Sequence, residues 1–142
     1  IAFGWSIPMA FAAQSGQLAS AVWILFLANI CWTIAYDTIY AIVDRDDDLK
    51  IGVKSTAILF GRHDRLIIGL LQLLTIGLLT WSGLVFERGA YYFVGLLFAS
   101  CFFLYQQWLI IGYDRTRCFQ AFLNNNWFGA VTFAGLALDY LP

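Results

Sequence analysis

Long apolar stretches alternate with short polar segments along most of the chain. The apolar stretches run roughly over residues 21–43, 66–86, 90–112 and 119–141. Each approaches the about 20 residues that a helix needs to cross a bilayer, so each predicts a membrane-spanning helix. Residues 1–13 are also apolar and predict the second half of a further span, which suggests a piece of a longer protein. We therefore expect an all-α fold, a polytopic transmembrane helix bundle.

The connection over residues 44–65 is the only long polar segment, and we expect a loop there. If the spans alternate in direction, seven of the eight basic residues lie on the side of this loop and Arg88 lies on the other. The seven are Arg45, Lys50, Lys54, Arg62, Arg65, Arg115 and Arg117. Because cytoplasmic segments contain the excess of Lys and Arg, the pattern predicts that the loop is cytoplasmic.

The composition agrees with an integral membrane protein, since 61% of the residues are hydrophobic and only 12% are charged. The net charge of −1 leaves no basic patch suited to a phosphate backbone, so we expect no nucleic-acid partner. Lipid and small molecules are the expected partners, and nothing indicates a protein partner. Cys31, Cys101 and Cys118 lack C-x-x-C spacing, so they predict no zinc site.

Five aspartates gather at the end of the first full span, at positions 37, 44, 46, 47 and 48. If the span continues as a helix to Asp48, a rotation of about 100° per residue places Asp37, Tyr40, Asp44 and Asp48 on one face. The side chains of Arg45, Asp46 and Asp47 then point elsewhere, and we expect them to be solvated. This placement puts like charges together at the negative end of a helix dipole, which favours a functional explanation.

Asp37 lies about two turns inside the span, where an unpaired carboxylate costs up to roughly 2.5 to 3.5 kcal/mol. Such a residue indicates function by default. Mg²⁺ would resolve the charge conflict, because it takes one or two carboxylates together with substrate phosphates. Solvation of Asp44 and Asp48 is an equally good interpretation of these two residues alone. The buried Asp37 and the bases that follow favour a site for Mg²⁺ and a diphosphate.

Other polar and small residues inside the spans favour helix packing. We expect the amides of Asn124, Asn125 and Asn126 to form interhelical hydrogen bonds rather than to contact a ligand. The glycines at positions 69, 77, 129 and 135 predict close approaches between helices. His63 has no second histidine with which to bind a metal, and we expect it at the surface.

The segment YDTIYAIVDRDDDLKIGVKSTAILFG, residues 36–61, resembles the second aspartate-rich motif of the UbiA superfamily of intramembrane prenyltransferases. Its pattern Y-D-x-x-Y-A-x-x-D-x-x-x-D is similar to the 4-hydroxybenzoate polyprenyltransferase branch, as are GWSIPMAF at residues 4–11 and NNNWFG at residues 124–129. The resemblance implies that residues 1–142 are the carboxyl-terminal part of one nine-helix domain in a bacterial inner membrane. The family's first aspartate motif is absent, so this portion alone should be inactive.

By this resemblance, the complete protein would transfer a polyprenyl group from polyprenyl diphosphate to the ring of 4-hydroxybenzoate, a step of ubiquinone biosynthesis. Asp44 and Asp48 would bind Mg²⁺ and, through it, the diphosphate. Asp37 and Tyr40 would line the reaction site as catalytic residues, and Lys50 and Lys54 would contact the diphosphate.

Two alternatives remain open on the residues alone. A prenyltransferase of the same superfamily could use another acceptor, such as haem or dihydroxynaphthoate, although the residue pattern Y-D-x-x-Y-A-x-x-D argues against this. A cation transporter could use Asp37, Asp44 and Asp48 as a relay, but the chain shows no internal repeat of the kind common in transporters.

Overall fold

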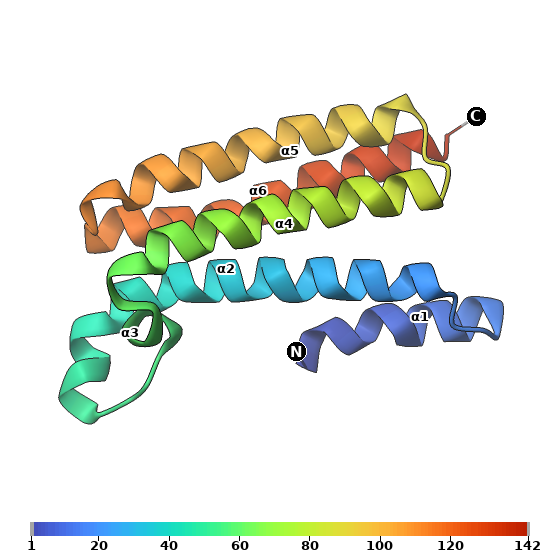
Figure 1. Cartoon of the computed structure of the whole chain (residues 1–142). Coiled ribbons are helices and arrows are strands. Elements are labelled where there is room, and N and C mark those ends of the chain that lie inside the picture. The colour runs from blue at the N-terminus through green and yellow to red at the C-terminus, as the bar shows by residue number, and fades with distance from the viewer. Residues whose placement is uncertain (1, 142) are drawn as a thin grey trace.

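The computed structural model describes residues 2–141, and these residues form helices and connections without any strand (Figure 1). Ile1, which belongs to the predicted first half-span, and Pro142 lie outside the described residues. The elements in chain order are η1 (Ala2–Trp5), α1 (Ser6–Ser15), α2 (Ser20–Ile51), α3 (Thr56–Phe60), η2 (Gly61–His63), α4 (Asp64–Val85), α5 (Ala90–Leu109), η3 (Ile110–Gly112) and α6 (Arg115–Asp139). The predicted all-α class is confirmed.

The long helices α2, α4, α5 and α6 lie side by side, and α1 packs along the amino-terminal half of α2 (Figure 1). Short connections reverse the chain between α4 and α5 and between α5 and α6. The end of α2, the start of α4, the end of α5 and the start of α6 therefore meet at one end of the bundle. The aspartate-rich segment lies at this end.

Three segments are long and apolar enough to cross a membrane, Ser20–Ile51, Thr56–Val85 and Ala90–Gly112. They confirm an integral membrane protein with several spans. Helix α6 has 25 residues but is not among them, because Arg115, Arg117 and several amides reduce its apolar character. The predicted fourth full span remains a prediction.

The segment predicted as a loop over residues 44–65 is largely helical. Helix α2 continues to Ile51 and ends at Gly52, whose φ of 74° is the left-handed conformation that glycine adopts without strain. Only residues 52–55 separate α2 from α3, and α4 begins at Asp64. Ion pairs explain why the helix persists through so many carboxylates, since Asp47 pairs with both Lys50 and Arg115.

Arg45 is not solvated as we expected, because it forms an ion pair with Asp64. The Asp64 side chain is fully buried, while that of Arg45 is 27% exposed. Arg45 also donates to the carbonyl of Ala57 at 3.2 Å, and the hydroxyl of Tyr113 donates to Asp64 at 2.7 Å. Partial burial and the Asp64 carboxylate raise the pKa of Tyr113, so its hydroxyl keeps the proton that it donates. The sequence pattern missed this cluster because its members are far apart along the chain.

A second polar cluster connects α4, α5 and α6 in the interior of the bundle. Gln72 donates to Gln106 at 2.9 Å, Gln107 donates to Gln72 at 3.0 Å, and Gln106 donates to Asn124 at 3.2 Å. Gln106 is completely buried, so these partners satisfy amide groups that would otherwise lose their hydration. The predicted interhelical role of Asn124 is confirmed.

Helices α5 and α6 make their closest approach at Gly95 and Gly135. A Cβ atom on Gly135 would lie 2.9 Å from the Cα atom of Gly95, so any side chain there would push the two backbones apart. This confirms the packing role predicted for Gly135. The same prediction is wrong for Gly77, since a Cβ atom there would meet nothing within 4 Å among the described residues.

We expect Gly135→Ala to destabilise the complete protein by about 1 to 3 kcal/mol, because the added methyl group meets backbone that cannot move aside cheaply. Thermal unfolding in detergent measures the effect, and Gly77→Ala is the matched control, since its methyl group would meet nothing within 4 Å. Equal melting temperatures for the two variants would contradict the close approach.

We expect Asp64→Asn to lower the free energy of unfolding, because Arg45 loses its counter-charge. Broken buried ion pairs cost about 3 to 5 kcal/mol, and the loss here should lie near the low end, since Arg45 keeps some contact with water. Thermal unfolding of the complete protein measures this loss. Asp46→Asn is the control, since Asp46 is exposed and forms no ion pair within residues 2–141. A melting temperature equal to that of this control would show that the cluster contributes little.

Candidate functional site

Helix α2 is unbroken from Ser20 to Ile51, so it presents Asp37, Tyr40, Asp44 and Asp48 on one face, as the spacing predicts. Asp37 and Tyr40 are exposed, and Asp44 and Asp48 are half-buried. The helix dipole and the mutual repulsion of the carboxylates oppose this arrangement. A positive group bound between these side chains would relieve that repulsion.

The two predicted metal ligands differ in their surroundings. Asp44 lies 3.5 Å from the guanidinium of Arg115, at the start of α6. Within the described part of the chain, the side chain of Asp48 has no hydrogen-bond or ion-pair partner, and neither has that of Asp37. Arg115 therefore lies beside the aspartate face and neutralises part of its charge.

The two lysines do not share this position. Lys50 donates to Asp47 at 3.0 Å, and the helical rotation places Lys50 away from the face of Asp44 and Asp48. Asp47 does not point elsewhere as we expected, because it shares the guanidinium of Arg115 with Asp44. Lys54 lies in the connection between α2 and α3, is exposed, and has no side-chain partner among residues 2–141. Of the two, Lys54 is the more available for an anion.

The described residues contain no group of three or more His, Cys, Asp or Glu side chains that could hold a metal ion. Two carboxylates nevertheless fit Mg²⁺, which completes its six ligands with waters and substrate phosphates. The donor set thus suits a metal that arrives together with a phosphorylated substrate. It does not suit a permanently bound ion.

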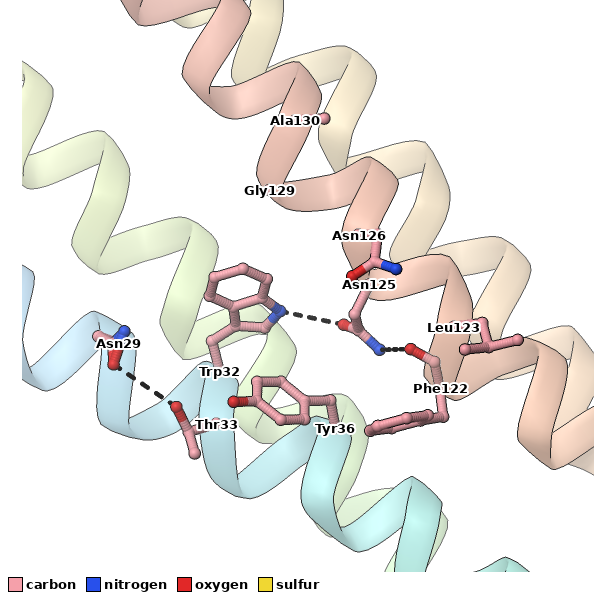
Figure 2. A pocket seen from close by; sticks show the side chains of 10 residues that line it. All are labelled: Asn29, Trp32, Thr33, Tyr36, Phe122, Leu123, Asn125, Asn126, Gly129 and Ala130. Atoms are coloured by element: carbon pink, nitrogen blue, oxygen red, sulfur yellow. Dashed lines mark hydrogen bonds between the residues drawn. The ribbon is translucent and has the colours of Figure 1, made fainter. Parts of the chain in front are cut away.

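A cleft of about 460 Å³ lies between α2 and α6, on the amino-terminal side of the aspartates (Figure 2). Its lining residues are Asn29, Trp32, Thr33, Tyr36, Phe122, Leu123, Asn125, Asn126, Gly129 and Ala130. The indole Nε1 of Trp32 donates to Oδ1 of Asn125 at 3.0 Å, which confirms the interhelical bond predicted for that amide. Asn126 instead lies exposed at the cleft, so the same prediction is wrong for this residue.

Aromatic rings connect the cleft with the aspartate face. Phe122 of α6 packs against Tyr36 and Tyr40 of α2, with ring centroids 6.1 Å and 5.0 Å away. Tyr36 precedes Asp44 by eight positions, which corresponds to about 12 Å along a helix axis. The cleft and the predicted diphosphate site are therefore neighbours on α2.

An apolar groove of about 700 Å³ continues from the cleft between α1, α2, α4 and α6. Asn29, Trp32 and Gly129 line both spaces, so Trp32 lies at the boundary between them. A Cβ atom on Gly129 would lie 3.1 Å from the Trp32 ring, so a glycine here leaves room for the indole. The polar cleft thus lies between the aspartates and an apolar space.

Sequence reasoning did not assign Trp32, Tyr36, Phe122 or Arg115 to the site. A usable signal existed on α2, because Asn29, Thr33 and Tyr36 precede Asp37 at helical spacing and extend the same polar face. No signal existed for Phe122 and Arg115, which approach this face only through the packing of α6 against α2.

A model of the UbiA prenyltransferase family matches residues 1–135. The 4-hydroxybenzoate octaprenyltransferase of Cronobacter sakazakii is 61% identical over 140 residues, which are 99% of this chain and 48% of that protein. Those of Shewanella frigidimarina and Alkalilimnicola ehrlichii are 60% and 59% identical over 99% and 97% of the chain. The chain spans about half the length of these curated relatives. No solved structure matches it.

Proposed function

The chain belongs to the UbiA prenyltransferase family, and we propose that the complete protein transfers a polyprenyl group from polyprenyl diphosphate to 4-hydroxybenzoate. The acceptor position is the ring carbon meta to the carboxylate, and the reaction is a step of ubiquinone biosynthesis. Support comes from relatives about 60% identical that are named for this reaction. The observation on which the proposal rests is the face of α2 that presents Asp44 and Asp48 together, with Arg115 beside Asp44.

In this proposal, Asp44 and Asp48 hold Mg²⁺, and Arg115 and Lys54 add positive charge near the diphosphate. Bound Mg²⁺ would supply electrostatic stabilisation of the negative charge that develops on the departing diphosphate. Lys50 was a candidate for the same role, but its bond to Asp47 leaves it a weaker one. The part of the complete protein that lies outside this chain would supply the first aspartate motif.

The reaction breaks the bond between the first prenyl carbon and the diphosphate oxygen and joins that carbon to the ring. The bonding electron pair leaves with the diphosphate when the first bond breaks, and the ring afterwards gives up the proton from the same position to water. Asp37 orients the phenol or stabilises the allylic cation from the aspartate face of α2, and Tyr40 lies one turn further along the same face. Both side chains are exposed on α2 and available to a substrate.

The apolar groove between α1, α2, α4 and α6 is suited to the polyprenyl tail. Seven of its fifteen lining residues are leucine, isoleucine or phenylalanine, so the groove offers isoprene units an apolar surface to pack against. The aspartate end of the bundle would face the cytoplasm across a bacterial inner membrane. The bilayer would supply the lipidic donor from the side.

We expect Asp44→Asn and Asp48→Asn each to reduce prenyl transfer by about 100-fold or more, the scale seen when a stabiliser of developing charge is removed. The assay is transfer to radiolabelled 4-hydroxybenzoate in membranes that contain the complete protein, polyprenyl diphosphate and Mg²⁺. Asp46→Asn is the control, since Asp46 is exposed on another side of the same helix turn. Full activity in both variants would contradict the proposed metal site.

We also expect Asp37→Asn to reduce turnover while the Mg²⁺ concentration for half-maximal activity stays unchanged, because Asp37 lies about two turns from the metal pair. A titration of Mg²⁺ at saturating substrates separates the two effects. Unchanged turnover in this variant would remove Asp37 from the reaction.

A further inference from the structure

The cleft between α2 and α6 has a lining that differs from that of the apolar groove. Three aromatic rings, Trp32, Tyr36 and Phe122, form its walls, and the amide of Asn126 lies open beside them (Figure 2). We propose that this cleft binds the aromatic acceptor, a planar ring with oxygen substituents. The inference rests on the proposed prenyl transfer and assigns a place to its second substrate.

The position of the cleft fits the geometry of the reaction. The reacting carbon of the donor is the one attached to the diphosphate, so the acceptor must lie beside the junction of the diphosphate site and the space for the tail. The cleft meets this condition, since Phe122 connects it to Tyr40 on the aspartate face and Trp32 borders the apolar groove. Its volume of about 460 Å³ also falls within the about 300 to 1,000 Å³ usual for small-molecule sites.

The wall formed by Trp32 is held in place before any ligand binds. Asn125 accepts the indole hydrogen bond, and its own amide donates to the carbonyls of Ala121 and Phe122 at 3.2 Å and 3.1 Å. Phe128 packs against the indole with ring centroids 5.1 Å apart. A fixed ring offers a flat surface at little entropic cost, which favours a planar ligand over a flexible isoprenoid chain. Asn125 is therefore a positioning residue.

Asn126 is the residue best placed to recognise the oxygen substituents. Its side chain is exposed at the cleft and has no hydrogen-bond partner within residues 2–141. An amide can donate to a carboxylate or phenol oxygen and accept from a phenol proton. An isoprenoid tail has no group that would use it.

The test measures Michaelis constants for both substrates in membranes that contain the complete protein. We expect Asn126→Leu to raise the KM for 4-hydroxybenzoate by about 3- to 10-fold, the effect of one lost hydrogen bond. The KM for polyprenyl diphosphate should change by less than about twofold, because the isoprenoid tail forms no hydrogen bond with Asn126. Gln120→Leu is the matched control, because Gln120 is an exposed amide on α6 outside the cleft.

A second variant tests the wall independently of Asn126. Asn125→Leu removes the acceptor of the Trp32 hydrogen bond, so we expect a higher KM for 4-hydroxybenzoate without an equal rise in the KM for polyprenyl diphosphate. A rise in the KM for polyprenyl diphosphate alone, in either leucine variant, would overturn the inference and assign the cleft to the tail. Wild-type membranes without any prenyl transfer would instead overturn the proposed function itself.

Discussion

The ion pair between Arg45 and Asp64 is the contact on which the arrangement of the site depends. It joins the end of α2 to the start of α4, and Tyr113 extends it through a hydrogen bond of 2.7 Å to the connection between η3 and α6. The Asp64 carboxylate is fully buried, so each donor that it binds offsets part of a large desolvation cost. Without these donors, a buried charge would remain at the meeting point of three helices.

This contact lies on a different side of α2 from the aspartate face. Arg45 follows Asp44 directly in the sequence, and successive helical residues differ by about 100° in direction. Arg45 lies toward Asp64, whereas Asp44 lies toward the start of α6, where Arg115 is 3.5 Å away. One side of the carboxyl-terminal end of α2 thus holds neighbouring helices together, and another side presents the residues of the proposed metal site.

The spaces along α2 follow an order that suits a substrate with one charged and one apolar end. Carboxylates and Arg115 come first, the aromatic and amide cleft follows, and the apolar groove lies beyond Trp32. The closely packed glycines of α5 and α6 and the amides of Gln72 and Gln106 hold the neighbouring helices together. These contacts keep the helices beside α2 in fixed positions, so one face of α2 can contact both proposed substrates.

The sequence by itself determined the all-α class, the long apolar helices and the register of Asp37, Tyr40, Asp44 and Asp48, because periodicity and hydropathy are local properties of a helix. The resemblance to the family followed from three short segments, of which the longest, residues 36–61, begins in α2 and ends at Gly61. Only the tertiary structure decided that Arg45 pairs with Asp64, that Arg115 reaches Asp44, and that Asn126 lines a cleft while Asn124 and Asn125 join helices. These outcomes depend on contacts between residues distant in sequence, whose rotation and distance no local pattern encodes.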